Sequence, residues 1–207
     1  MQIKKPVPVN QQIYDFLFRQ IMEGTFSAGT RLAEERIAAQ LGVSRTPVRE
    51  SILRLEHEGL LRNKCVIEPT FKEVRECYEI RILLESYAAR QAATFMEETD
   101  KKHLKSLIET SKSRDFETAM RAHTEFHNLI VRACGNDRIT HIIERMQAII
   151  LLCRRDVVRN RVELPDEHGD IFEAVLSGDG DLAESLMRQH LVRNYHEMLN
   201  RFGRDAQ

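Results

Sequence analysis

Four of the eight histidines have a spacing that suits metal binding. His123 and His127 are four residues apart, so both imidazoles lie on one face if this segment is helical. His168 and His190 fall in the last two predicted helices. Imidazole is a common ligand of zinc, nickel and copper, whereas magnesium and calcium prefer oxygen. A pair with this spacing is more often an ordinary core or surface feature, so spacing alone leaves both interpretations open.

A second group of chemically useful side chains opens a predicted helix that ends near Gly59. Arg45 and Arg49 lie four residues apart, and each guanidinium could bind guanine O6 and N7 or a phosphate. The hydroxyls of Ser44 and Thr46, together with the free amides of the helix start, suit phosphate positioning. The core-facing stripe of the same helix is formed by Val48, Ile52 and Leu55. The alternative is that this arginine pair is simply a solvated surface.

Arg81 lies in the middle of a predicted helix that is mostly apolar. Its neighbours are Ile80, Leu83, Leu84 and Ala88. A buried or half-buried guanidinium there needs an anion. Glu85, four residues further on, is the structural candidate for that partner.

The stretch 123–127 also resembles, at a glance, the zinc-protease pattern His-Glu-x-x-His. In this chain the glutamate, Glu125, follows the first histidine by two residues instead of one. It therefore lies about 200° around the helix from His123 and should point away from a metal. The chain also contains no nucleophile constellation or phosphate-binding loop, so we expect it not to be an enzyme, and a metal-dependent hydrolase is the weakest alternative.

Composition describes an ordinary soluble protein of 207 residues, with 42% hydrophobic and 30% charged residues. Residues 1–70 carry a net charge of +2 and the remainder −3, so charge alone does not indicate nucleic-acid binding. The four cysteines form no Cys-x-x-Cys pair. No signal peptide or membrane-length apolar run is present. We therefore expect a cytoplasmic protein that does not span a membrane.

Helical spacing of apolar residues runs through most of the chain and predicts a mainly α fold. Pro69 marks a boundary between residues 1–68 and 69–207. The first part is predicted to hold a helix around Ile13–Ile21 capped by Asn10, helices at 34–41 and from Ser44 onward, and a hairpin of residues 60–62 and 65–67. The second part is predicted to be an all-α bundle with helices at about 71–96, 100–110, 114–133, 137–160, 165–177 and 180–201.

The first part resembles the winged helix-turn-helix domain of GntR-family regulators. The resemblance is carried by Arg31-Leu32-Ala33-Glu34-Glu35, by Ile37-Ala38, by the run from Leu41 to Glu50, and by Leu53, Leu55-Glu56 and Glu58-Gly59-Leu60. We expect DNA contacts from Arg31, Ser44, Arg45, Thr46, Arg49 and Lys64. The wing is shorter than is usual in that family, because only Asn63-Lys64 separates its strands. The recognition helix should therefore do most of the reading.

The second part resembles the FCD effector domain of the FadR subgroup within that family. The matching residues include Tyr78-Glu79-Ile80-Arg81, Leu84-Glu85, Phe126-His127, Gly135-Asn136, Glu167-His168, Gly178-Asp179 and His190-Leu191. In metal-binding members, an aspartate and three histidines hold a divalent ion. The resemblance implies a site of His123, His127, His168 and His190, with His123 where the aspartate is expected. His123 could instead point away and leave three ligands.

Neutral imidazoles would leave the 2+ charge of the ion uncompensated and favour an anionic ligand. Zinc is the default metal by ligand type, with nickel as an alternative. The resemblance also implies that Arg81 faces the effector cavity, where it could hold a small carboxylate together with the metal. The resemblance therefore implies a homodimeric regulator of palindromic operator DNA whose operator affinity depends on a carboxylate effector. Repression is the commoner arrangement in this family, so we expect a repressor. Direct metal sensing is the alternative.

Overall fold

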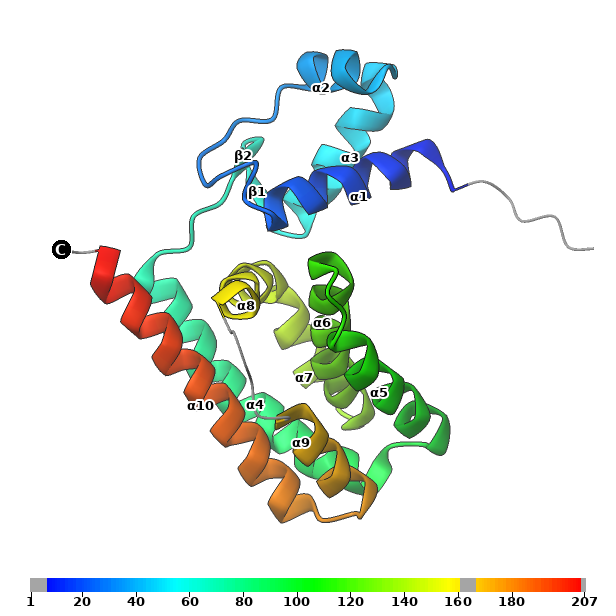
Figure 1. Ribbon diagram of the computed structural model, residues 1–207, viewed down its shortest axis with the longest axis vertical. Helices are drawn as coiled ribbons and strands as arrows, with labels where there is room; N and C mark the ends of the chain where they lie inside the picture. The colour runs from blue at the N-terminus through cyan, green and yellow to red at the C-terminus, as the bar shows by residue number, and fades with distance from the viewer. Residues whose placement is uncertain (1–6, 161–166, 206–207) are drawn as a thin grey trace, which may run out of the picture. The chain divides into compact units, whose positions relative to one another are not determined.

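The structure is a computed structural model that describes residues 7–160 and 167–205, with the backbone alone for 154–160 and 200–205. The chain divides into two compact units, Met1–Pro69 and Thr70–Gln207, and each is considered by itself. The helices and the short hairpin are labelled in Figure 1. The mainly α fold, with a winged helix-turn-helix followed by a helical bundle, is confirmed.

Three helices build the core of the first unit: α1 (Val9–Met22), α2 (Glu34–Leu41) and α3 (Arg45–His57). The predicted apolar stripes are buried, because Ile13, Leu17 and Ile21 of α1 pack with Val48, Ile52 and Leu55 of α3. The predicted cap at Asn10 is wrong. Helix α1 begins at Val9 after Pro8, whose fixed φ already suits a helix start, and the Asn10 side chain instead accepts a hydrogen bond from the Gln11 amide.

The turn between α2 and α3 depends on Gly42. This residue has φ +65°, in the left-handed region, and its amide donates to the carbonyl of Ala38. A side chain at this position would strain the backbone. The turn lets α3 begin three residues later, so Gly42 fixes where the start of the recognition helix lies.

The wing is a two-stranded antiparallel hairpin of β1 (Leu61–Arg62) and β2 (Cys65–Val66). Asn63 and Lys64 have φ values of 52° and 61°, which is the pattern of a two-residue primed turn. The hairpin is also held by the segment before α2: the Leu32 amide donates to the Lys64 carbonyl over 2.8 Å, and Arg31 bridges to Cys65. The wing therefore lies beside the start of α2.

A polar contact fixes α1 on the second half of α3. The Tyr14 hydroxyl donates to Glu58 Oε2 over 2.6 Å, and Arg54 Nε donates to Glu58 Oε1 over 2.9 Å. The Arg54 guanidinium carbon lies 3.7 Å from the centre of the Tyr14 ring. Burial and the acceptor Glu58 raise the pKa of Tyr14. These contacts hold the C-terminal end of α3 against α1 and leave its N-terminal end free of them.

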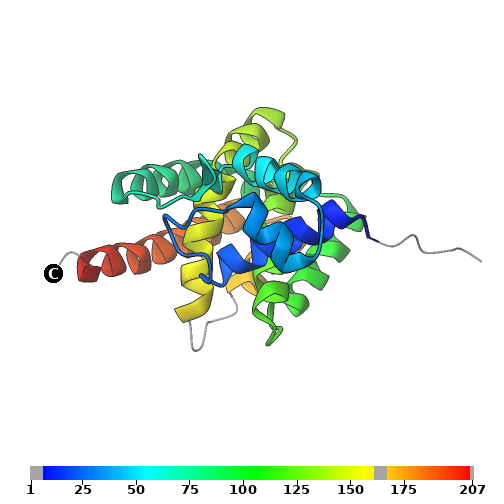
Figure 2. The same cartoon turned by 90° about the horizontal axis from the view of Figure 1, so that it is seen from above.

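The second unit is a helical bundle. Its helices are α4 (Phe71–Phe95), α5 (Glu98–Ser111), α6 (Phe116–Ala133), α7 (Asp137–Arg145), α8 (Gln147–Asn160), α9 (Glu167–Leu176) and α10 (Gly180–Asp205). Helix α10 runs along α4, as Figures 1 and 2 show. A capping box of Thr70 and Glu73 starts α4. Within the described residues, no helix is long and apolar enough to cross a membrane.

One predicted helix of this unit is wrong. Residues 137–160 form two helices, α7 and α8, which are separated at Met146. The Met146 amide bonds to the carbonyl three residues earlier, at Ile143, and ends α7. The break lets Ile139 and Ile143 of α7 and Ile150 of α8 enter one core. No glycine or proline marks this break, so it has no local signal in the sequence. The predicted start of α9 at 165 lies outside the described residues.

Candidate nucleic-acid interface and metal centre

The start of α3 presents the predicted DNA-contacting side chains to solvent. Ser44, Arg45, Thr46 and Arg49 are all exposed, whereas Val48 between them is fully buried. Ser44 occupies the N-cap position, although its side chain makes no cap hydrogen bond. The first amides of α3 and two guanidinium groups therefore face outward together. This arrangement can bind phosphate oxygens and the edges of bases.

Glu34 connects this helix start to the wing. Its carboxylate is largely buried, accepts a hydrogen bond from Lys64 Nζ over 2.7 Å, and lies 3.6 Å from an Arg45 terminal nitrogen. The hydrogen bond from Lys64 holds the pKa of Glu34 below its usual value, against the effect of burial. Glu35 forms a closer ion pair with Arg45, at 2.8 Å. Lys64 is therefore tied to α2, and Arg45 is held at the edge of the exposed face.

Arg31 and Arg49 complete the set of predicted DNA contacts. Arg49 is exposed one turn after Arg45, and Arg31 is exposed where its backbone bridges to Cys65 of the wing. The first unit thus places cationic side chains from three segments, namely the residues before α2, the start of α3 and the tip of the wing.

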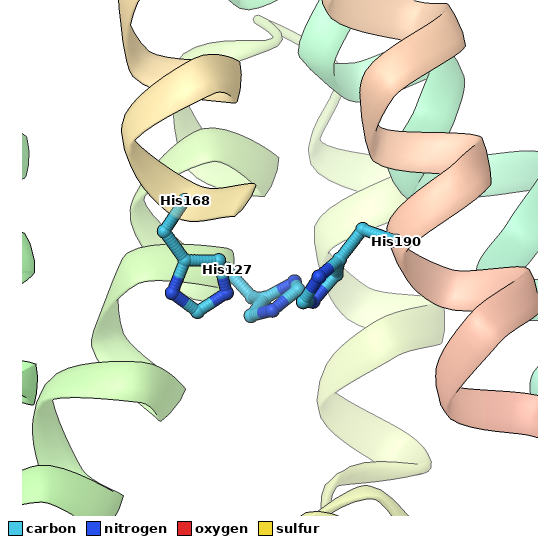
Figure 3. Close-up of side chains that lie close together, drawn as sticks. All are labelled: His127, His168 and His190. Atoms are coloured by element: carbon cyan, nitrogen blue, oxygen red, sulfur yellow. The ribbon is translucent and has the colours of Figure 1, made fainter. Parts of the chain in front are cut away.

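In the second unit, three of the four predicted histidines come together. His127 of α6, His168 of α9 and His190 of α10 are buried, and each offers a nitrogen within 4.8 Å of those of the other two. Figure 3 shows the three rings gathered between their helices. The ring of Phe126 stacks on His168 with 4.2 Å between centroids. His123 is half-buried and outside this group, and its Nδ1 lies 3.3 Å from Nδ1 of His168.

Glu85 joins this group to Arg81. Its Oε2 accepts from His127 Nδ1 over 2.7 Å, and its Oε1 accepts from Arg81 Nε over 2.6 Å. Only 2% of Arg81 and 1% of Glu85 is exposed. Burial by itself would raise the pKa of Glu85, but Arg81 and His127 together hold it well below its usual value. Likewise burial works against the charge of Arg81, and Glu85 outweighs it, so the pKa of Arg81 is raised.

His190 has a similar carboxylate behind it. Its Nδ1 lies 2.6 Å from Oε2 of Glu167. The other carboxylate oxygen of Glu167 pairs with Arg193. On the opposite side of the ring, Asn194 Nδ2 lies 3.1 Å from His190 Nε2, so this amide must turn aside for Nε2 to bind an ion. Sequence reasoning gave no role to Glu167 or Asn194 and treated Glu85 as a partner of Arg81 only. Two features of the sequence could have indicated them. Glu167 directly precedes His168, and Asn194 follows His190 by four residues, which places both on one helix face.

These residues fit a divalent ion of the zinc class. Because a carboxylate only accepts, it fixes the proton on Nδ1 of His127 and of His190, which leaves the Nε2 lone pair as the ligand atom. Two nitrogens bound at about 2.0–2.1 Å to a tetrahedral ion lie about 3.4 Å apart, so nitrogens that are now within 4.8 Å of one another must close by up to about 1.4 Å through side-chain rotation. Three imidazoles are soft enough for zinc or nickel and poor ligands for calcium.

The glutamate of the protease-like stretch lies elsewhere. Glu125 forms a surface ion pair with Arg132. The described residues therefore give the histidine group neighbours that orient imidazoles, rather than a base that could activate water.

A helix-turn-helix head followed by a helical domain is an arrangement typical of DNA-binding regulators. Comparisons with known proteins agree. Residues 76–193 match the FCD domain, and residues 9–64 match the bacterial regulatory proteins of the gntR family. The chain belongs to the GntR family, in the group that carries an FCD domain. It is a DNA-binding transcription regulator and not an enzyme.

Relatives and a solved structure extend this agreement over nearly the whole chain. The transcriptional repressor RspR of Escherichia coli is 32% identical, over 92% of this chain and 89% of its own. The gluconate operon transcriptional repressor of Bacillus subtilis is 30% identical, over 86% of this chain and 79% of its own. A putative GntR regulator from Rhodococcus has the same fold, with a TM-score of 0.73 at 23% identity, covering 92% of this chain and 97% of that one.

Proposed function

We propose that this protein is a repressor whose operator affinity is set by a small carboxylate bound at a divalent metal in the second unit. The observation that carries the proposal is the buried group of His127, His168 and His190. Two of these imidazoles have a carboxylate on Nδ1, as metal-binding histidines usually do. A buried group of this kind is costly to assemble without a ligand to bind.

The charge of the site favours an anion. Three neutral imidazoles do not reduce the 2+ charge of the metal, and Glu85 is already neutralised by Arg81. A carboxylate effector would supply the missing negative charge. The gluconate named for the Bacillus subtilis relative is a small carboxylate of this type. We propose zinc as the metal, with nickel as the alternative, and we propose that Arg81 supports the bound carboxylate through its remaining donors.

On DNA, we propose that Arg45 and Arg49 read base edges, while Ser44, Thr46, Arg31 and Lys64 contact phosphates. The described part of the chain holds one such reading helix, so a palindromic operator requires two chains.

We propose that a second copy covers the stripe of Ile80, Leu83 and Tyr87 on α4. These residues follow helical spacing, and Leu83 is 61% exposed. In Leu83→Glu we expect monomers in sedimentation analysis and weak operator binding. A stable Leu83→Glu dimer would disprove this surface.

The deciding experiment is an operator-binding titration of the full chain in four conditions: metal-free, with Zn²⁺ alone, with a small carboxylate alone, and with both. We expect operator affinity to change most when both are present, because the carboxylate needs the metal in order to bind. By linkage, operator DNA must then change carboxylate affinity by the same factor. A full response to Zn²⁺ alone would identify a direct metal sensor instead. No response to any condition would disprove control through this site.

A further inference from the structure

The three grouped histidines share one feature: each Nδ1 is already occupied by a side chain from outside the group. His127 Nδ1 contacts Glu85 of α4, and His190 Nδ1 contacts Glu167 at the start of α9. For His168 the same place is taken by Nδ1 of His123, at 3.3 Å. His123 therefore contacts Nδ1 of His168 in the same way as Glu85 and Glu167 contact Nδ1 of His127 and His190.

We propose that His123 is a positioning residue for His168 and not a metal ligand. This inference rests on the proposed metal site and specifies which of its residues bind the ion. It departs from the four-histidine set that the sequence suggested, because the nitrogen of His123 that approaches the group is spent on His168.

Tautomers give the proposal its chemical content. One of two imidazole nitrogens 3.3 Å apart must donate and the other accept. If His168 binds the metal through Nε2, its own proton lies on Nδ1 and is donated to His123 Nδ1. His123 then carries its proton on Nε2. Each of the three ligands thus presents Nε2 to the ion with its Nδ1–H bonded behind, which fixes ring orientation.

The consequence for the effector is an incomplete coordination sphere. Three protein nitrogens leave at least one position open on a tetrahedral zinc and more on a metal of higher coordination number. His123, as a neutral imidazole, adds no negative charge near the ion, and Glu85 and Glu167 are each paired with an arginine. The open positions therefore suit a small anion that binds through oxygen, such as a carboxylate. A site of four protein ligands would instead be closed on tetrahedral zinc.

Nuclear magnetic resonance can separate the two arrangements directly. The full chain, with ¹⁵N-labelled histidine, is loaded with ¹¹³Cd²⁺ as a stand-in for zinc, because only a nitrogen bonded to cadmium shows scalar coupling to it. We expect coupling at Nε2 of His127, His168 and His190, and none at either nitrogen of His123. The His123→Ala variant serves to assign the His123 signals. Coupling at a His123 nitrogen would overturn the proposal.

Zinc affinity provides the second readout. We expect His123→Ala to bind Zn²⁺ about 10–100-fold more weakly, with cadmium coupling kept at the other three histidines. His123→Gln should recover part of the loss, because its amide oxygen can accept from His168 Nδ1. His141→Ala, a change of an exposed histidine on α7, is the matched control and should bind zinc normally. Unchanged affinity in His123→Ala would also overturn the proposal. If the wild-type chain bound neither metal, the proposed metal site itself would fail.

Discussion

The two units of this regulator place arginine in opposite surroundings. Arg45 and Arg49 are exposed to solvent at the start of α3, where Glu34 and Glu35 form ion pairs with Arg45. Arg81 is enclosed within the helical unit and bonded to Glu85. An exposed charge keeps its hydration and stays available to DNA, whereas a buried charge must be compensated inside the fold. The exposed arginines of the first unit therefore remain available to bind a phosphate or a base, whereas the buried arginine of the second unit stabilises an internal ion pair.

The strongest test of this contrast is to remove one half of the buried pair. Glu85→Gln leaves the Arg81 charge without its counterion, and we expect a loss of about 3–5 kcal/mol in the free energy of unfolding. Chemical denaturation of metal-free protein measures it. The double variant Arg81→Met/Glu85→Leu removes both charges and should recover most of the stability. A Glu85→Gln protein as stable as wild type would show that the buried Arg81 charge does not need Glu85 as its counterion.

The metal centre should fail by loss of ligands rather than by loss of fold. In the His127→Ala/His190→Ala variant we expect zinc affinity to fall by more than about 100-fold, beyond the effect of any residue behind a ligand. Metal analysis after dialysis should find about one ion per wild-type chain and little in the variant. The His141→Ala protein is again the control. Equal metal content in the double variant would refute the site.

The exposed arginines should affect DNA binding without affecting stability. Arg49→Ala should weaken operator binding by about 1–3 kcal/mol and relax the preference for one base, if Arg49 binds a guanine edge. Fluorescence anisotropy at fixed salt, with operator variants, measures both effects. Arg75→Ala, which removes an exposed arginine of α4, is the matched control. An equal loss on all sequences would assign Arg49 to phosphate instead.

The smallest expected effect concerns Glu34, the acid that ties Lys64 of the wing to α2. A pKa lowered in the folded state means that the carboxylate stabilises the fold above its unfolded pKa of about 4.3. This contribution is lost as the pH falls through the lower folded value. Thermal unfolding should therefore show Glu34→Gln less stable than wild type at neutral pH, with the difference shrinking below about pH 4. A difference that persists in acid would point to packing rather than charge.

How much of the site the sequence predicted differs between the units. In the head, Ser44, Arg45, Thr46 and Arg49 come from six consecutive positions at the start of α3, so their common exposure follows from local spacing. In the second unit, spacing only suggested His127, His168 and His190, and a resemblance was needed to join them into one site, because they lie on three separate helices. Glu85 is 42 residues from His127 in sequence, and no local pattern relates them.

The sequence by itself determined the helical periods, the left-handed turn at Gly42 and the two-residue turn of the wing. Each depends on neighbours within a few residues. Only the tertiary structure decided the break at Met146, the hydrogen bonds that join the wing to residues 29–32, and the contact of His123 with His168. That last pair is 45 residues apart, and its approach depends on how α9 packs against α6. The spacing of His123 and His127 indicated a shared helix face, but a hydrogen-bond partner is set by the packing of the whole bundle.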